Sequence, residues 1–275
     1  MRIMQRVALG IFLAGAFLVS AAARAQDPQV LMPEQSAAKA KQLLEQAIQA
    51  LGGDAYLNEH DSTCTFRLSQ FGHSGELTGY AKLTDYEKLP DKARVENSGK
   101  RNIIEVYNGD KGWIMDRGGV QEAPEDILAE RRDNEKKDLD NILHNRIKEP
   151  GMIFRYAGPD TVDLKEADWV ELVDRDGRTI RLALDRSTHL PTRKIIVTRD
   201  PSTRLRVEEI EYYSNYHAIQ GIQTPFQISS ERNELKTGQI FLEDCKYNTG
   251  LPDSLFTKES LDERWSKVGK KMKKK

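Results

Sequence analysis

The side chains that most often carry chemistry are few in this sequence and far apart. Its five histidines stand alone, at His60, His73, His144, His189 and His217. None belongs to an HExxH pattern or to another close spacing that would direct two imidazoles at one metal ion. We therefore expect no metal site and no cofactor, and we interpret the histidines as ordinary surface or core residues.

Two short stretches only partly match functional motifs. Gly72-His73-Ser74-Gly75 begins like a nucleophile elbow, but Glu76 takes the place of the final glycine and a β-turn replaces the strand–turn–helix context. Asp174-Arg175-Asp176-Gly177 begins like a calcium loop, but no further acids follow, which favours a hairpin turn. We expect no catalytic residue. An envelope hydrolase that uses an unrecognised carboxylate pair is a third-ranked alternative.

Cys64 and Cys245 are the two cysteines of the chain. Neither belongs to a CxxC pattern, which argues against a metal site. In an oxidising compartment an even pair can become a disulfide, and both residues fall in predicted strands. We predict the Cys64–Cys245 disulfide, with two buried free thiols as the alternative.

Apolar side chains at alternating strand positions are the remaining candidates for a site. Residues two apart on a strand share one face of the sheet. We predict that a ligand cavity is lined by members of this set, with plain core packing as the alternative: Phe66, Leu68, Leu83, Trp113, Met115, Ile180, Leu182, Phe226 and Ile228.

Periodicity predicts one amphipathic helix and then a long series of strands. The helix spans Pro33 to Leu51 and stops at Gly52-Gly53. Asn108-Gly109 and Asp176-Gly177 predict tight hairpins. The predicted strands are Thr63–Phe71, Leu77–Tyr86, Arg101–Tyr107, Trp113–Asp116, Trp169–Val173, Thr179–Leu184, Leu190–Thr198, Arg204–Tyr213, Ile222–Ser230 and Gln239–Tyr247.

The strand series is interrupted once, by a charged helical segment from Pro124 to Lys148, and a last helix is expected from Lys258 to about Val268. No βαβ rhythm is present. This order predicts an α+β fold, in which helices cover the concave side of one large, curved antiparallel sheet. With no Gly/Ser linker, we expect one domain over residues 26–266, followed by a lysine-rich tail at 267–275.

The first 25 residues match a secretory signal. Arg2 and Arg6 precede an apolar run over residues 7–19, and Ala23-Arg24-Ala25 supplies small residues at the −3 and −1 positions. The run is shorter than the ~20 residues that span a bilayer, which disfavours a transmembrane anchor. We expect cleavage after Ala25 and a periplasmic location.

Charge is unevenly distributed along the chain. Residues 26–266 contain 33 basic and 43 acidic residues, a net charge of −10, whereas the tail contributes six lysines. An acidic body repels phosphate, so we expect no nucleic-acid partner. The tail is expected to be solvated, with transient contact to anionic lipid headgroups as an alternative.

Three stretches together resemble the LolA/LolB-like periplasmic lipoprotein carriers and related outer-membrane lipoprotein-sorting proteins. Residues 107–113 resemble the hairpin that leads to the lid helix of that group, and residues 182–191 resemble its "hydrophobic-D-x-x-T-x-L-P" junction. Residues 207–226, with Asn215, Ile222 and Pro225, resemble the strand pair that follows. The similarity covers roughly residues 35–255.

The resemblance implies an unclosed β-barrel with a helical lid, here Pro124–Lys148, over an apolar cavity that takes acyl chains without covalent chemistry. We therefore expect a non-enzymatic carrier or binder of lipoprotein acyl chains or another lipid. The alternative is a protein-interaction or envelope-stress sensing module of the same fold, whose partner is an envelope protein.

Overall fold

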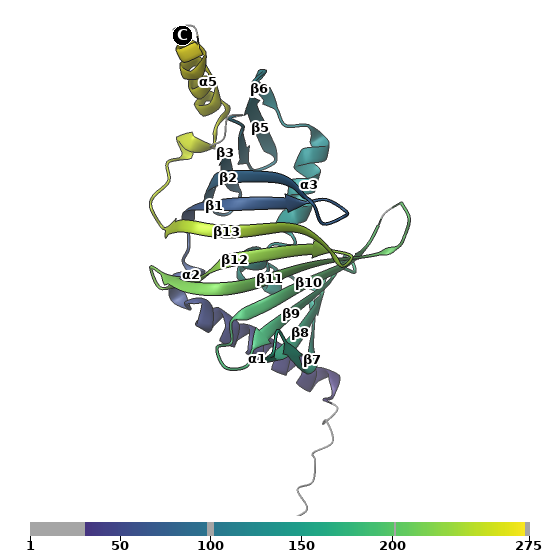
Figure 1. Cartoon of the computed structure of the whole chain (residues 1–275). Helices are drawn as coiled ribbons and strands as arrows, with labels where there is room; N and C mark the ends of the chain where they lie inside the picture. The colour runs from purple at the N-terminus through teal and green to yellow at the C-terminus, as the bar shows by residue number, and fades with distance from the viewer. Residues whose placement is uncertain (1–30, 98–101, 201, 273–275) are drawn as a thin grey trace, which may run out of the picture. The chain divides into compact units, whose positions relative to one another are not determined.

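The computed structural model describes residues 31–97, 102–200 and 202–272 (Figure 1). The predicted signal peptide and the last three lysines lie outside these ranges. From Met32 onward the described residues belong to one compact unit. Among the helices of these residues, none combines the length and the hydrophobicity of a membrane-spanning segment.

The first helix, α1, spans Pro33–Leu51, as the sequence predicts. A proline at its first position has the backbone torsion a helix needs and no amide hydrogen to leave unpaired. At its end Gly52 adopts a φ of 140°, and a Cβ there would lie 2.5 Å from the Gly221 carbonyl oxygen. One face of α1 is buried, through Ala40, Leu43, Leu44, Ala47, Ile48 and Leu51.

Thirteen strands are described, and ten of them lie where strands were predicted. The ten are β1 (Asp61–Phe71), β2 (Leu77–Lys88), β4 (Ile104–Asn108), β5 (Lys111–Asp116), β8 (Lys165–Val173), β9 (Thr179–Asp185), β10 (Pro191–Arg199), β11 (Arg206–Ile219), β12 (Ile222–Arg232) and β13 (Leu235–Tyr247). Both predicted hairpins are present, with Gly109 at φ 58° between β4 and β5 and Gly177 at φ 76° between β8 and β9.

The sequence analysis missed three strands: β3 (Lys92–Asn97), β6 (Gly119–Glu122) and β7 (Ile153–Val162). In β3 every second residue is charged (Lys92, Arg94 and Glu96), so the strand lacks the apolar run by which the other strands were recognised. The strand β7 contains Gly158-Pro159, a pair that is unfavourable inside a sheet, and it is tolerated because β7 is an edge strand.

All thirteen strands form one antiparallel sheet in the order β6-β5-β4-β3-β2-β1-β13-β12-β11-β10-β9-β8-β7. The first and last strands therefore pair near the middle of the sheet, and the edges are β6 and β7, which are consecutive along the chain. The predicted α+β class and unclosed sheet are confirmed. Short helices complete the unit: α2 (Asp54–Leu57), α3 (Glu125–Glu135), α4 (Leu139–His144), η1 (Arg146–Lys148), η2 (Asp253–Phe256) and α5 (Lys258–Met272).

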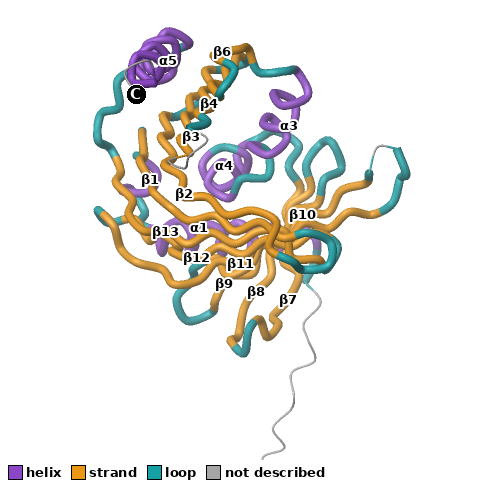
Figure 2. Tube along the Cα trace, turned by 45° about the horizontal axis from the view of Figure 1, so that its top comes forward, coloured by secondary structure: helices purple, strands orange, loops and turns teal. Residues whose placement is uncertain are grey.

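The helices pack in two places. Both α1 and α4 bury apolar side chains against β8–β12 in the main core, so helices cover the concave side as predicted. In Figure 2, α4 lies inside the curve of the sheet, with α3 beside it. A second cluster joins Phe256 of η2 and Leu261 of α5 to Ile104, Val106 and Met115 of β4 and β5.

The predicted disulfide is present between Cys64 of β1 and Cys245 of β13. The two residues are directly opposite in the antiparallel ladder, with their Cα atoms 4.1 Å apart. They are separated by 181 residues in sequence. The bond therefore ties the two ends of the strand series together at the centre of the sheet.

We predict that the double variant Cys64→Ser/Cys245→Ser is less stable by about 2–5 kcal/mol, because the crosslink restricts the unfolded chain over a long loop. Urea denaturation of the oxidised wild type and the double variant measures the difference. Reduced wild type should match the variant. Equal midpoints for all three samples would contradict the prediction.

Candidate functional site

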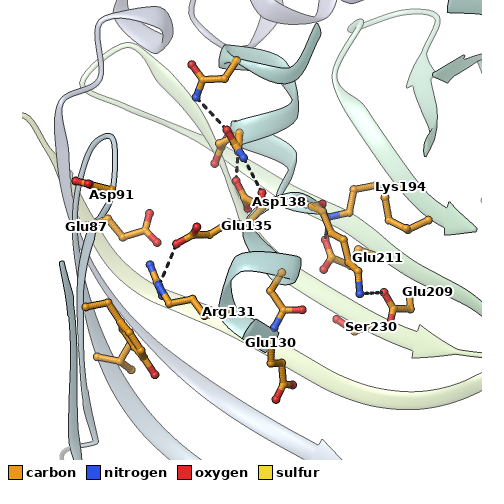
Figure 3. Close-up of a pocket in the computed structure, with 18 of the residues that line it drawn as sticks. Glu87, Asp91, Glu130, Arg131, Glu135, Asp138, Lys194, Glu209, Glu211 and Ser230 are labelled. Carbon is orange, nitrogen blue, oxygen red and sulfur yellow. Dashed lines mark hydrogen bonds and ion pairs between the residues drawn. The ribbon is translucent and has the colours of Figure 1, made fainter. Parts of the chain in front are cut away.

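A cleft of about 830 Å³ lies between the α3–α4 segment and the sheet. Its walls come from β2–β5 on one side, from α3 and α4, and from β10–β13 on the other. In Figure 3, Glu87 extends from β2 toward Arg131 and Glu135 of α3, while Lys194 and Glu211 line the opposite wall. Eleven Asp or Glu residues and six Lys or Arg residues line the cleft, so its lining is strongly acidic.

A smaller chamber of about 250 Å³ adjoins the cleft, because Glu59, Asp138, Asp140, Glu211 and Ser230 border both. The rest of its wall is mainly apolar or aromatic. These residues are Leu51, Tyr56, Leu139, Tyr213, Tyr216, Ile222, Pro225, Ile228, Ile240 and Tyr247, with Gln223 and Thr224. The cavity system thus has an acidic outer part and an apolar inner part.

The strand register places an apolar strip beside the chamber. In one row Leu83 pairs with Phe66, and Phe66 pairs with Leu242. In the next row the residues are Ala81, Leu68, Ile240 and Ile228. All seven side chains are only partly buried. Since Ile240 and Ile228 also line the chamber, the apolar strip continues from the chamber across β12, β13, β1 and β2.

The structure separates the nine predicted lining residues into several groups. Four of them lie in the apolar strip, and of these Ile228 borders the chamber: Phe66, Leu68, Leu83 and Ile228. Ile180 and Leu182 are fully buried in the main core. Trp113 and Met115 belong to the second cluster, whereas the intervening Ile114 lines the cleft. Phe226 packs edge-on against His217, at 4.6 Å between ring centroids. Ligand binding by this set stays a prediction.

Sequence reasoning missed the residues that dominate the cavities. Tyr56, Tyr213, Tyr216 and Tyr247 come from three different elements, α2, β11 and β13, and only the fold brings them together. The carboxylates are equally dispersed. The one usable signal is the Asp138-Leu139-Asp140 triplet, in which two acids flank an apolar residue at the start of a helix. In the described ranges, no group of His, Cys, Asp or Glu is arranged to hold a metal ion.

The predicted helical segment Pro124–Lys148 is divided into parts that are held differently. In α4, Leu139, Ile142 and Leu143 are buried in the main core. In α3 no residue is buried. The buried residues are therefore concentrated in the second half of the segment, whereas its first half is charged and lies at the surface.

Ion pairs attach α3 and the turn after it to the sheet. Asp133 pairs with Arg178, and Lys137 Nζ lies 2.7 Å from Asp133 and 2.8 Å from Glu209. Lys194 Nζ donates to the Lys137 carbonyl at 2.6 Å. Gly112 allows α3 to approach the sheet closely, because a Cβ at this position would lie only 2.9 Å from the Leu128 side chain of α3. The segment is therefore held close to the sheet by charges and by one glycine.

Behind the turn, Arg146 pairs with Asp174 at 2.8 Å, and both side chains are buried. Arg146 also donates to the Lys136 carbonyl oxygen. This pair joins the end of the α3–α4 segment to the β8–β9 hairpin. A buried pair with these additional hydrogen bonds is fully satisfied, and loss of either partner would leave a buried charge.

Burial and mutual repulsion shift several carboxylates in and beside the cleft toward their protonated forms. Burial, and then the Asp140 charge, raise the pKa of Glu59 to about 8. Burial raises the pKa of Asp85 to about 6, although Arg131 opposes the shift. Asp85 in turn raises the pKa of Glu87. The surroundings thus stabilise the charged forms of these three carboxylates poorly.

We predict that amides of α3 exchange with solvent faster than those of α4 or β9, because ion pairs at a surface contribute little and buried apolar side chains contribute more. Hydrogen exchange measures this. Arg178→Gln and added salt should raise exchange in α3, whereas Arg155→Gln, which removes an ion pair elsewhere, should not. Protection of α3 equal to that of β9 would contradict the prediction.

We predict that the protein loses stability as pH rises through the range from 4.5 to about 8. In this range folded Glu59 holds a proton that the unfolded chain releases, so the unfolding free energy falls with pH. Between about pH 5.5 and 8.5 the loss should be on the order of 2 kcal/mol, and smaller in Glu59→Gln. Urea denaturation measures it, with Glu166→Gln as the control. The same pH slope in Glu59→Gln and wild type would refute the assignment.

Three solved structures share the topology. A DUF1329 family protein from Desulfovibrio piger gives a TM-score of 0.58 at 18% identity, over 81% of this chain and 98% of that chain. A domain assigned as an outer-membrane lipoprotein-sorting protein, from Vibrio parahaemolyticus, gives 0.54 at 13% identity, over 81% and 99%. A LolA superfamily protein from Nitrosomonas europaea gives 0.52 at 17% identity, over 81% and 99%.

No protein-family model matches the sequence, and no curated protein is similar to it. Because the sequence identities to the three structures are low, the comparison shows a similarity of fold alone. It agrees with the resemblance noted in the sequence and with the unclosed antiparallel sheet described above. The chain therefore has the LolA-like fold.

Proposed function

We propose that the protein is a non-enzymatic periplasmic binder or carrier of lipoprotein acyl chains or another lipid. One observation carries this proposal: the apolar strip runs without interruption into the chamber, through Ile228 and Ile240. An acyl chain lying on the strip would cover side chains that are now only partly buried, at about 25 cal/mol for each Å² of apolar surface removed from water. The role assigned to the similar domain from Vibrio parahaemolyticus, lipoprotein sorting, agrees with a ligand of this kind.

The location forms part of the proposal. The signal at residues 1–25 would direct export, and the Cys64–Cys245 disulfide is typical of proteins that fold in an oxidising compartment. The lysine tail is proposed to make transient contact with anionic lipid headgroups during loading or release.

We predict that Ile228→Ala and Leu68→Ala weaken the binding of a neutral twelve-carbon alcohol, each by a factor of about 5–30, because about 0.8 kcal/mol is lost for each buried methylene. Isothermal titration calorimetry measures the affinities. Leu164→Ala is the matched control, since Leu164 is 98% exposed. Native mass spectrometry of protein purified from its own envelope should show bound lipid.

Failure of every amphiphile to bind, with no lipid in the native sample, would refute lipid binding and favour the protein-interaction alternative. One observation supports that alternative. Tyr80 and Phe241 lie on the face of β2 and β13 opposite the apolar strip and are 63% and 39% exposed. Capture of an envelope protein that is lost in Tyr80→Ser/Phe241→Ser would support it.

A further inference from the structure

Three neighbouring hairpin turns lie at one end of the sheet, and each exposes a leucine. They join β1 to β2, β12 to β13 and β10 to β11, and these six strands are consecutive in the sheet order. The leucines at these turns are Leu77, Leu235 and Leu205, which are 59%, 44% and 68% exposed. We call this region the leucine end; its turns lie on the right in Figure 1. Single exposed leucines are common, but three on adjacent turns form an apolar surface.

Contacts between the turns hold the leucine end together. The Lys236 ammonium lies over the Phe71 ring, 4.5 Å from its centroid, and Phe71 pairs with Leu77. On the other side, the Asn233 backbone N–H donates to the Glu208 carbonyl oxygen at 2.8 Å, and the Glu208 N–H donates to the Asn233 side chain at 2.9 Å. The β12–β13 turn is therefore attached both to the β1–β2 turn and to the start of β11.

The cleft extends to the leucine end. Its lining includes Glu231 and Arg232 at the end of β12 and Thr237 near the start of β13. Along the chain, Leu235 lies between these lining residues. The leucine end therefore borders one opening of the cleft.

The apolar strip leads toward the same end. The strand row that follows the strip consists of Gly79, Gln70, Gly238 and Ser230. In this row only Gln70 has a long side chain, and that side chain is exposed. The strip is therefore not closed by a buried side chain of this row, and a ligand lying on it would point toward the turns.

The β10–β11 turn has the charge that suits a phosphate surface. Leu205 is flanked by Arg204 and Arg206, and residues 199–206 contain three arginines and one aspartate, although the body of the protein is acidic. Arg204 is exposed, and Arg206 also pairs with Glu208. An apolar side chain between two guanidinium groups matches the interface of a lipid bilayer, where phosphates lie above the acyl chains.

We propose that the leucine end docks on the surface of a phospholipid bilayer. Leu77, Leu205 and Leu235 enter the acyl region, and Arg204 and Arg206 meet the phosphates. In this orientation the cleft and the apolar strip open toward the membrane, so a lipid reaches the chamber without crossing bulk water. This inference rests on the proposed function, because the bilayer is the source of the lipid, and it specifies where the lipid enters.

Flotation with vesicles of phosphatidylethanolamine and phosphatidylglycerol tests the docking. We expect Leu77→Ser/Leu205→Ser to bind at least about tenfold more weakly than wild type, because two side chains no longer enter the acyl region. The matched control is Leu57→Ser/Leu164→Ser, whose leucines are 39% and 98% exposed and lie in α2 and in the β7–β8 turn. The control should bind like wild type, and circular dichroism checks that both variants are folded.

The arginines are tested separately. Arg204→Gln/Arg206→Gln should bind these anionic vesicles about 5–30-fold more weakly, with a smaller effect on vesicles of phosphatidylcholine alone. Lys165→Gln/Arg186→Gln makes the same charge change in the β7–β8 and β9–β10 turns, at the opposite end of the sheet, and should bind like wild type.

A transfer measurement connects docking to loading. A pyrene-labelled fatty acid should move from vesicles to Leu77→Ser/Leu205→Ser at least about fivefold more slowly than to wild type. The affinity of this variant for dodecanol in solution should be unchanged, because neither substitution alters the chamber.

Equal vesicle binding by wild type and Leu77→Ser/Leu205→Ser would overturn the inference and assign any membrane contact to another surface, such as the lysine tail. An equal loss in Leu57→Ser/Leu164→Ser would also overturn it. Wild type that binds dodecanol but no vesicles would refute docking and leave lipid binding standing. Capture of an envelope protein that is lost in Leu77→Ser/Leu205→Ser, without vesicle binding, would replace the bilayer with a protein partner. Failure of wild type to bind any amphiphile in solution would refute the proposed function itself.

Discussion

The pairing of β1 with β13 is the interaction on which the rest of the structure depends. It joins the two ends of the strand series near the middle of the sheet, and the Cys64–Cys245 disulfide fixes its register. A slip of one residue between the two strands would turn either Phe66 and Leu68 or their partners Leu242 and Ile240 away from the concave side. The apolar strip, the chamber that it enters and the walls of the cleft all require this one alignment.

Because β1 pairs with β13 near the middle of the sheet, the two edge strands are β6 and β7. The chain connects these two edges through α3 and α4. The two halves of the connection are stabilised differently. In α4 three apolar residues are buried in the main core, whereas α3 is held over an acidic cleft by surface charges. The cleft is thus bordered by an element whose attachment depends on ionic strength, beside one whose attachment does not.

Much of the fold could be predicted from local pattern. The helix α1, ten strands and both glycine hairpins carry strong periodicity or turn signals, and the disulfide was predicted from the expected compartment and the strand positions. The pattern failed for β3 and β7, where charge or a Gly-Pro pair replaces apolar alternation. It also failed for the cavities. Alternation shows that Trp113 and Met115 share a face, but not which face, and the neighbouring Ile114 borders the cleft. The acidic lining of the cleft could not be predicted from the sequence either, because its carboxylates come from elements that are far apart along the chain.

The central position of the last strand has a consequence for how the molecule forms. Until β13 is available, β1 presents an unpaired edge, and β12 presents another, so the growing sheet exists as two separate halves. Pairings this distant in sequence form slowly, and exposed strand edges invite association with other chains. Nearly the whole polypeptide must therefore emerge before the sheet can become continuous. A nascent chain of this protein should need protection during that interval, whether it emerges from a ribosome or from a translocation pore.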